Sequence, residues 1–73
     1  ELMIVVGSKS SANTTHLAEI LSQVTETIHI ETHEELDLYK ELFNKTNNIG
    51  ITAGASTPDF VINEVIKKIG DQY

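Results

Sequence analysis

The sequence has no cysteine and no tryptophan, and it has a single proline among its 73 residues. Without cysteine, the chain cannot build a disulfide, a thiolate metal site or a cysteine nucleophile from its own residues. This usage fits a protein of a reducing compartment, so we expect a cytoplasmic location.

Basic clusters and long apolar runs are also missing. Five Lys and Arg stand against eleven Asp and Glu, which gives a net charge of −6. Nucleic-acid binding depends on clustered Lys and Arg, so we expect no nucleic-acid partner. No apolar run approaches the roughly 20 residues of a membrane-spanning helix, so we expect no membrane partner. The three histidines lack the spacing of metal ligands, and we expect no metal site in this chain.

The residues that are present indicate one small globular domain over 1–73. Hydrophobic residues make up 40% of the chain and charged residues 22%, a composition typical of folded rather than disordered proteins. The chain begins with Glu1 and enters an apolar run at once, whereas a gene product normally begins with methionine. We therefore interpret it as a truncated fragment of a larger protein.

Apolar strands and amphipathic helices alternate along the chain. Residues 2–6 form an apolar run typical of a strand covered on both faces. Residues 27–31 alternate between apolar and polar, which favours an edge strand, and residues 49–52 form a third strand. Three helices are predicted from the spacing of their apolar residues: Leu17, Ile20, Leu21 and Val24 over 13–25; Leu36, Tyr39, Leu42 and Phe43; and Ile62, Val65, Ile66 and Ile69.

Sequence signals for capping mark the ends of these helices. Ser11 or Asn13 is suited to cap the first helix, and Thr32 and Glu35 form a capping box for the second. The third helix has the chain's single proline at its first position and Gly70 as a C′ glycine. A turn is predicted at 45–48.

This alternation predicts a βαβαβα chain with a short parallel sheet, a three-layer α/β sandwich. The first strand is apolar throughout and belongs in the centre, whereas the alternating second strand belongs at an edge. The pattern therefore favours the strand order 2-1-3 over 1-2-3. Ligands of open α/β sheets bind where the strand order reverses, at the carboxyl ends of the strands. The loops that leave the first and third strands meet there.

Small hydroxyl, amide and glycine residues crowd both of these loops, from Gly7 to Thr14 and from Thr52 to Asp59. Each loop leads from a strand into a helix, so backbone N–H groups and a positive helix end point at one place. This arrangement suits an anion such as phosphate. In an acidic chain such a site relies on local dipoles, on Lys9, or on groups supplied from elsewhere. The same residue types also cap helices and form tight turns, so a purely structural role stays open.

The two loops also resemble a known family. Residues 5–14, VVGSKSSANT, followed by Leu17, Ala18 and Glu19, are similar to the VVGSKNSSNTxxLxE segment of the 4-hydroxy-3-methylbut-2-enyl diphosphate reductase family, IspH/LytB. Residues 50–59 resemble that family's GxTAGASTPD segment. Residues 30–36 and the spacing between the motifs agree as well, so the resemblance covers almost the whole chain.

The resemblance implies an oxidoreductase of the non-mevalonate pathway of isoprenoid biosynthesis, which reductively removes the hydroxyl of an allylic diphosphate to give isopentenyl and dimethylallyl diphosphates. It implies a three-lobed enzyme with a [4Fe-4S] cluster and a ferredoxin or flavodoxin-type electron donor. This chain corresponds to the C-terminal lobe, which grips the diphosphate beside the other two lobes. The cluster cysteine of that lobe lies upstream of this strand. We therefore expect no cluster ligand and no catalytic residue in this fragment, and no activity from it alone.

Carried over position by position, Ser11 and Asn13 match two diphosphate-binding positions of the first motif, and Ser56 matches one in the second. Ala12 stands where the family has its second consecutive serine, and Ser10 stands where it has asparagine. Ala12 removes a hydroxyl from the diphosphate site. We expect it to weaken or rearrange the grip unless Ser10 or a water compensates.

A second class of function stays open on the residues alone. A non-catalytic α/β module that binds a phosphorylated metabolite, or a protein partner, would use the same crevice. The reductase differs from it in needing two further lobes and an upstream cysteine. A third alternative is an empty crevice with an acidic face that mediates assembly, which salt-sensitive dimerisation would reveal.

Overall fold

The computed structural model describes residues 1–46 and 48–72. Asn47, inside the predicted turn at 45–48, and Tyr73 lie outside the described residues. Strands and helices alternate in the predicted order: β1 (Leu2–Val6), α1 (Ala12–Ser22), β2 (Glu26–Ile30), the 3-10 helix η1 (His33–Tyr39), α2 (Lys40–Lys45), β3 (Ile49–Ala53) and α3 (Asp59–Gln72).

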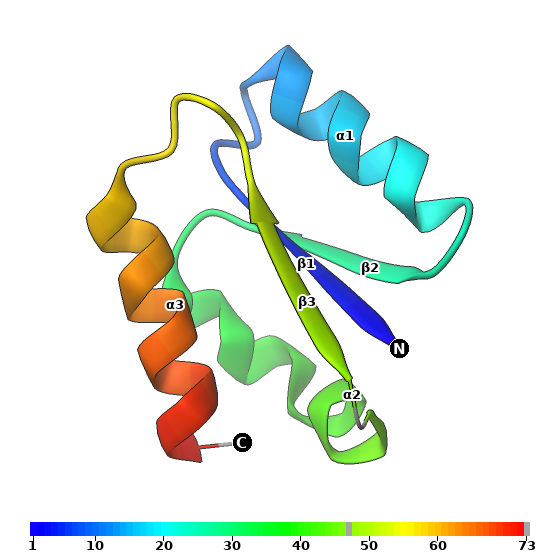
Figure 1. The fold of residues 1–73 in the computed structure, drawn as a ribbon, viewed down its shortest axis with the longest axis vertical. Coiled ribbons are helices and arrows are strands. Elements are labelled where there is room, and N and C mark those ends of the chain that lie inside the picture. The colour runs from blue at the N-terminus through cyan, green and yellow to red at the C-terminus, as the bar shows by residue number, and fades with distance from the viewer. Residues whose placement is uncertain (47, 73) are drawn as a thin grey trace.

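The three strands form one sheet in the order β2-β1-β3, and both pairs are parallel (Figure 1). Ile4 at the middle of β1 lies opposite Ile28 on β2 and Ile51 on β3. The predicted order 2-1-3 is therefore confirmed. Its physical reason is burial, because β1 is covered by helices on both faces whereas Thr27 and His29 of β2 stay partly exposed.

Helices cover both faces of the sheet, so the predicted three-layer α/β sandwich is confirmed. α1 packs on one face against β1 and β2, while η1, α2 and α3 gather on the other face (Figure 1). Val5 has none of its side chain exposed, and strand alternation directs it to the α1 face. The main core lies on the opposite face and consists of Leu2, Ile4, Val6, Ile28, Ile30, Leu36, Phe43 and Val65.

The predicted second helix is divided into two parts. His33–Tyr39 wind as a 3-10 helix, and Lys40–Lys45 follow as an α-helix. Within the 3-10 segment, Leu36 and Tyr39 pack in or against the core and are three residues apart. This spacing matches the three residues per turn of a 3-10 helix and keeps the side chains on one side. The capping box of Thr32 and Glu35 is present.

Two helix ends differ from the prediction. α1 ends at Ser22, so Val24 lies beyond the helix and is 79% exposed instead of joining its apolar face. α3 continues through Gly70, so the prediction of a C′ glycine there is wrong. An added Cβ at Gly70 would meet nothing within 4 Å. Glycine lowers helix propensity, but packing of the helix against the core outweighs that preference.

The start of α3 also lies one residue later than predicted. α3 begins at Asp59, so the chain's proline precedes the helix instead of occupying its first position. The Pro58 carbonyl accepts the N–H groups of Val61 at 3.1 Å and Ile62 at 3.4 Å. Pro58 therefore acts as the boundary residue whose carbonyl starts the helical hydrogen bonds.

Thr14, in the first turn of α1, packs between two glycines at the carboxyl edge of the sheet. Its side chain is 1% exposed. A Cβ on Gly7 would lie 2.8 Å from Thr14 Cγ2, and a Cβ on Gly54 would overlap Thr14 Oγ1. Because glycine has no Cβ, the backbone of both loops can approach α1 closely. This packing fixes the start of α1 against the ends of β1 and β3.

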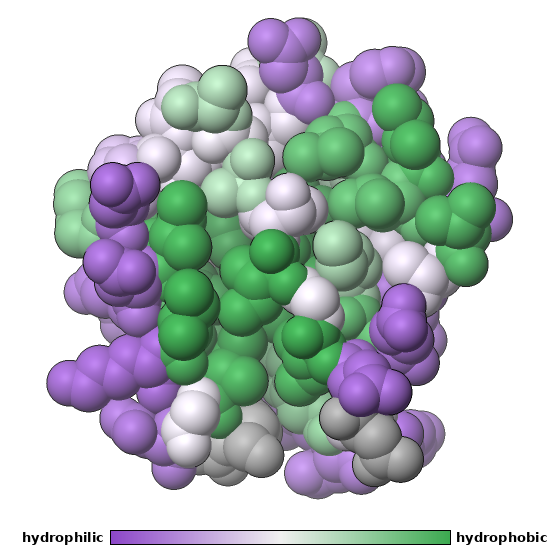
Figure 2. Space-filling view, in the orientation of Figure 1, coloured by the Kyte–Doolittle hydropathy of each residue, from purple (hydrophilic) through white to green (hydrophobic). Residues whose placement is uncertain are grey.

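β3 is an edge strand with an apolar surface beside it. Figure 2 shows apolar side chains gathered on the face where Figure 1 shows β3 between α1 and α3. On these two helices Ile20, Phe60 and Ile66 are 49%, 66% and 50% exposed. Among the described residues, no helix combines the length and the apolar character that crossing a bilayer demands.

Leu36→Ala should lower the free energy of unfolding by about 2–5 kcal/mol, the usual cost of truncating a buried leucine. Leu36 has no exposed surface, whereas Leu38 on the same helix is 77% exposed. Leu38→Ala should therefore change stability by less than about 0.5 kcal/mol. Urea unfolding followed by circular dichroism measures both variants. Equal losses would contradict the inward orientation of Leu36.

Gly54→Ala should destabilise the domain by about 1–3 kcal/mol, because the new methyl group collides with Thr14. Gly70→Ala is the matched control and should stabilise the domain by about 0.5–1 kcal/mol, because the site is open and alanine favours the helix. Thermal unfolding measures the change in stability of both variants. A neutral Gly54→Ala would refute the close packing, and a destabilising Gly70→Ala would refute the continuation of α3.

Candidate anion-binding site

The two predicted loops lie at the same edge of the sheet, where β1 and β3 end. The Val6 carbonyl accepts the Gly54 N–H at 3.1 Å and the Thr57 hydroxyl at 3.0 Å. On the other side of β1, the Gly7 N–H donates to the Ile30 carbonyl at 2.9 Å. The end of β1 is therefore tied to the loops of both neighbouring strands.

The N-terminus of α1 offers the positive end of an 11-residue helix. The first-turn N–H groups of a helix have no partner within the helix, and the helix dipole adds partial positive charge there. α1 has no acidic residue in its first turn, whereas α3 has Asp59 in its own. Of the two helix starts that follow the loops, α1 is therefore the one better suited to an anion.

The Ser11 hydroxyl caps α1 and uses its oxygen as a hydrogen-bond acceptor, so its O–H group remains as a donor. Ser11 Oγ accepts the Thr14 N–H at 3.4 Å and the Thr14 hydroxyl at 3.2 Å. A hydroxyl has two acceptor sites and one donor. With both acceptor sites taken, the Ser11 O–H remains available to donate to an outside acceptor, such as a phosphate oxygen.

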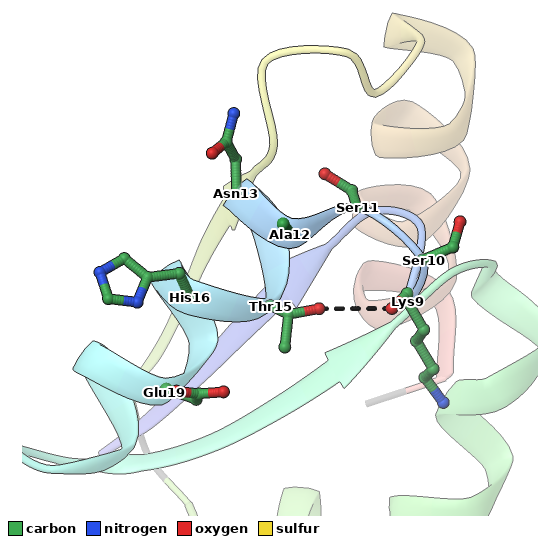
Figure 3. A pocket seen from close by; sticks show the side chains of 8 residues that line it. All are labelled: Lys9, Ser10, Ser11, Ala12, Asn13, Thr15, His16 and Glu19. Carbon is green, nitrogen blue, oxygen red and sulfur yellow. Dashed lines mark hydrogen bonds between the residues drawn. The ribbon is translucent and has the colours of Figure 1, made fainter.

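Asn13 lies beside Ser11 in the first turn of α1. Its amide is exposed, and Figure 3 shows it projecting outward on the same side as the Ser11 hydroxyl. Ala12 lies between them in the sequence and is also exposed. These residues line a surface hollow of about 550 Å³ together with Lys9, Ser10, Thr15, His16 and Glu19 (Figure 3).

Ser56, the predicted residue of the second motif, lines a different hollow. That cavity has about 220 Å³ and is formed by Gly7, Ser8, Glu31, Ser56, Thr57, Pro58 and Val61. The structure thus brings Ser10, Ser11, Ala12 and Asn13 together at one hollow. It places Ser56 at a second hollow on the same edge of the sheet.

Ser10 has a hydrogen-bond partner within its own loop. Its hydroxyl lies 2.7 Å from Ser8 Oγ, and its N–H donates to the same Ser8 oxygen at 3.2 Å. Figure 3 shows the Ser10 side chain on the far side of the loop from Asn13. In this conformation Ser10 does not replace the hydroxyl that Ala12 removes.

Lys9 does not present its ammonium group to the hollow beside α1. Its Nζ lies 3.0 Å from Glu35 Oε1, and Figure 3 shows the side chain pointing away from Ser11 and Asn13. The hydrogen bond and the charge of Glu35 raise the pKa of Lys9 above 10.5. Burial opposes ionisation of Glu35, but hydrogen bonds from the Glu31 backbone, Lys9 and the Thr32 backbone outweigh it and lower the pKa of Glu35 below 4.5.

The histidines and acidic residues of the described ranges do not converge on a metal site. Over residues 1–46 and 48–72, no three His, Asp or Glu side chains are arranged to hold a metal ion. His29 Nε2 lies 3.0 Å from the Gly7 carbonyl and so supports the loop after β1. The chain also has no cysteine, so its own residues do not fit an iron–sulfur cluster.

Sequence reasoning missed the roles of two residues at this edge. Thr14 is buried and packs against both loops, and Glu31 accepts a hydrogen bond from the loop after β1. Glu31 Oε2 accepts the Lys9 N–H at 2.7 Å. No spacing signal links residues 22 positions apart, because their contact arises from strand pairing. Gly7 and Gly54 were the available sequence signal for this packing, because a glycine lets the backbone approach another element closely.

Comparison with known proteins points to one family. The family model described as LytB protein matches residues 1–70. The 4-hydroxy-3-methylbut-2-enyl diphosphate reductase of Clostridium tetani is 52% identical over 73 residues, which cover 99% of this chain and 11% of that protein. The protein of the same name from Pseudothermotoga lettingae is 49% identical over 69 residues, which cover 94% of this chain and 24% of that protein.

A solved structure shows the same fold. The structure of (E)-4-hydroxy-3-methyl-but-2-enyl diphosphate reductase, described as the terminal enzyme of the non-mevalonate pathway, matches with a TM-score of 0.87 and 44% identity. The match covers 96% of this chain and 25% of that one. This chain thus spans 11% to 25% of the length of these relatives. With the family model matching residues 1–70, the chain belongs to the LytB family.

Proposed function

We propose that this chain is the diphosphate-binding lobe of a 4-hydroxy-3-methylbut-2-enyl diphosphate reductase. Relatives of that name align with nearly the whole chain. The observation that carries the proposal is the Ser11 hydroxyl, whose two acceptor sites are occupied by Thr14. Its remaining donor stands beside the start of a helix without acidic residues in its first turn.

The groups at the start of α1 bind one phosphate of the substrate in this proposal. The Ser11 hydroxyl, the Asn13 amide and the first-turn N–H groups donate hydrogen bonds to its oxygens. A diphosphate carries a second phosphate, which allows the other end of the group to reach toward Ser56. The role of this lobe is to hold the diphosphate in place while the allylic carbon and its hydroxyl extend toward the rest of the enzyme.

The remaining parts of the reaction belong to the rest of the protein. Reductive removal of the hydroxyl yields isopentenyl and dimethylallyl diphosphates, and a [4Fe-4S] cluster supplies the electron-transfer chemistry when it is bound there. This chain contributes no cluster ligand. We propose that the other two lobes pack near the exposed apolar surface beside β3. The ferredoxin or flavodoxin-type donor and the cytoplasmic location stay predictions of the family resemblance.

Ser11→Asp separates capping from anion binding. Aspartate caps a helix as well as serine does, so the fold should persist, but its negative charge should weaken pyrophosphate binding by about tenfold or more, which is about 1.4 kcal/mol or more. NMR titration of the 73-residue chain with pyrophosphate should shift the amides of Ser11, Asn13 and Ser56 in the unmodified protein.

The matched control is Ser22→Asp, which adds the same charge at the last residue of α1. This variant should bind pyrophosphate like the unmodified chain. Absence of shifts in the unmodified chain at millimolar pyrophosphate would refute the proposed anion site. Equal weakening by both variants would show that only the net charge matters.

Ala12→Ser should tighten pyrophosphate binding. The substitution restores a hydroxyl at an exposed position in the hollow beside Ser11 and Asn13. One added hydrogen bond of about 0.5–1.5 kcal/mol corresponds to about a two- to tenfold gain in affinity. Ala18→Ser, on the same helix beyond its first turn, is the control and should have no effect. Isothermal titration calorimetry measures both, and equal affinities would contradict the placement of position 12 at the anion.

A further inference from the structure

Lys9 is held by two acidic residues that follow β2, Glu31 in the loop and Glu35 in η1. Its backbone N–H donates to Glu31 Oε2 at 2.7 Å, and its ammonium donates to Glu35 Oε1 at 3.0 Å. Its carbonyl accepts the Thr15 hydroxyl of α1 at 3.3 Å. One residue of the loop before α1 is thus bound at its backbone and at the end of its side chain.

Glu35 is the fixed member of this arrangement. While its Oε1 binds Lys9, its Oε2 accepts the N–H groups of Glu31 at 2.7 Å and Thr32 at 3.0 Å. Its side chain is 23% exposed, compared with 54% for Lys9. Three donors therefore hold one carboxylate in place. Glu35, the third residue of η1 and the partner of Thr32 in the capping box, thus also binds the side chain of a residue in the anion-binding loop.

The contact between Lys9 and Glu35 lies close to the candidate site in the sequence. Lys9 lies two residues before Ser11, whose hydroxyl caps α1 and faces the hollow. Movement of Lys9 would displace the Ser11 backbone and with it the donors at the start of α1. The negative charge of Glu35 also offsets the attraction of the Lys9 ammonium for an anion.

We infer that Lys9 and Glu35 are positioning residues, which clamp the loop after β1 to the start of η1 so that Ser11 and Asn13 keep their anion-binding geometry. Lys9 itself does not bind the anion. This inference rests on the proposed function. Positioning by Lys9 and direct binding of the anion by Lys9 predict opposite changes in anion affinity when Glu35 is neutralised.

Glu35→Gln provides the test, in the full-length protein with inorganic pyrophosphate as the probe in isothermal titration calorimetry. Glutamine retains an oxygen for the capping box but loses the charge that holds Lys9. Affinity should fall about two- to fivefold, as expected for the loss of an exposed charge pair. Lys9→Met should show a similar fall, and the double variant should be no weaker than either single variant.

Three further measurements separate positioning from general damage. Lys9→Arg keeps the ion pair and, unlike Lys9→Met, should bind pyrophosphate with the affinity of the unmodified protein. Asp37→Asn is the matched control, because it removes one negative charge from the same helix and a 3.3 Å contact with Lys68. It should leave binding unchanged. With the allylic diphosphate as substrate, Glu35→Gln should raise KM and leave kcat unaltered.

Direct binding of the anion by Lys9 predicts the opposite result. Glu35→Gln would then free the ammonium and bind pyrophosphate as tightly as the unmodified protein or more tightly, while Lys9→Met would weaken binding. That pattern overturns the positioning role and leaves the proposed function intact. Failure of the unmodified protein to bind pyrophosphate would overturn the proposed function and this inference together.

Discussion

The side chain of Thr14, enclosed between Gly7 and Gly54, ties the start of α1 to the ends of β1 and β3. A buried hydroxyl needs a hydrogen-bond partner, since leaving it unpaired costs about 1–3 kcal/mol. Thr14 finds this partner in Ser11 Oγ. The same bond occupies an acceptor site of Ser11 and leaves its O–H to donate outward. A packing requirement thereby sets the chemistry of the residue that faces the hollow.

The charged side chains of this domain do not by themselves favour an anion at the carboxyl edge of the sheet. The chain carries a net charge of −6, and the lysine nearest the hollow is paired with Glu35. The start of α1, which has no acidic residue in its first turn to oppose the helix dipole, is therefore a source of partial positive charge beside Ser11. Neutral donors of this kind recognise phosphate oxygens by geometry. Long-range attraction of a charged ligand would have to come from elsewhere in a larger protein.

The surface beside β3 fits the small share of its relatives that this chain spans. Chains near this length bury only about 60% of their unfolded surface, and here apolar side chains also remain exposed on α1 and α3 along the edge strand (Figure 2). An unpaired edge next to an apolar surface favours contact with further chain. The candidate site residues lie at the carboxyl end of the same sheet.

Much of the fold was predictable because its signals are local. The apolar run of β1 and the alternation in β2 gave the strand order, and the two small-residue loops gave the edge of the sheet where the candidate site lies. Local signals failed where packing decided the outcome. α3 runs through Gly70, whose neighbour Ile69 packs against the core. η1 winds as a 3-10 helix, which no local signal of the sequence predicted.

The sequence by itself determined the order of strands and helices, because the apolar period can be read along the chain, and the resemblance of its two loops to the reductase family implied Ser11, Asn13 and Ser56 as candidate residues. The tertiary structure alone decided how these residues are used. It paired Lys9 with Glu35, 26 positions away, and it placed Ser56 at a different hollow from Ser11. Such contacts form only when parallel pairing on both sides of β1 brings three distant loops to one edge.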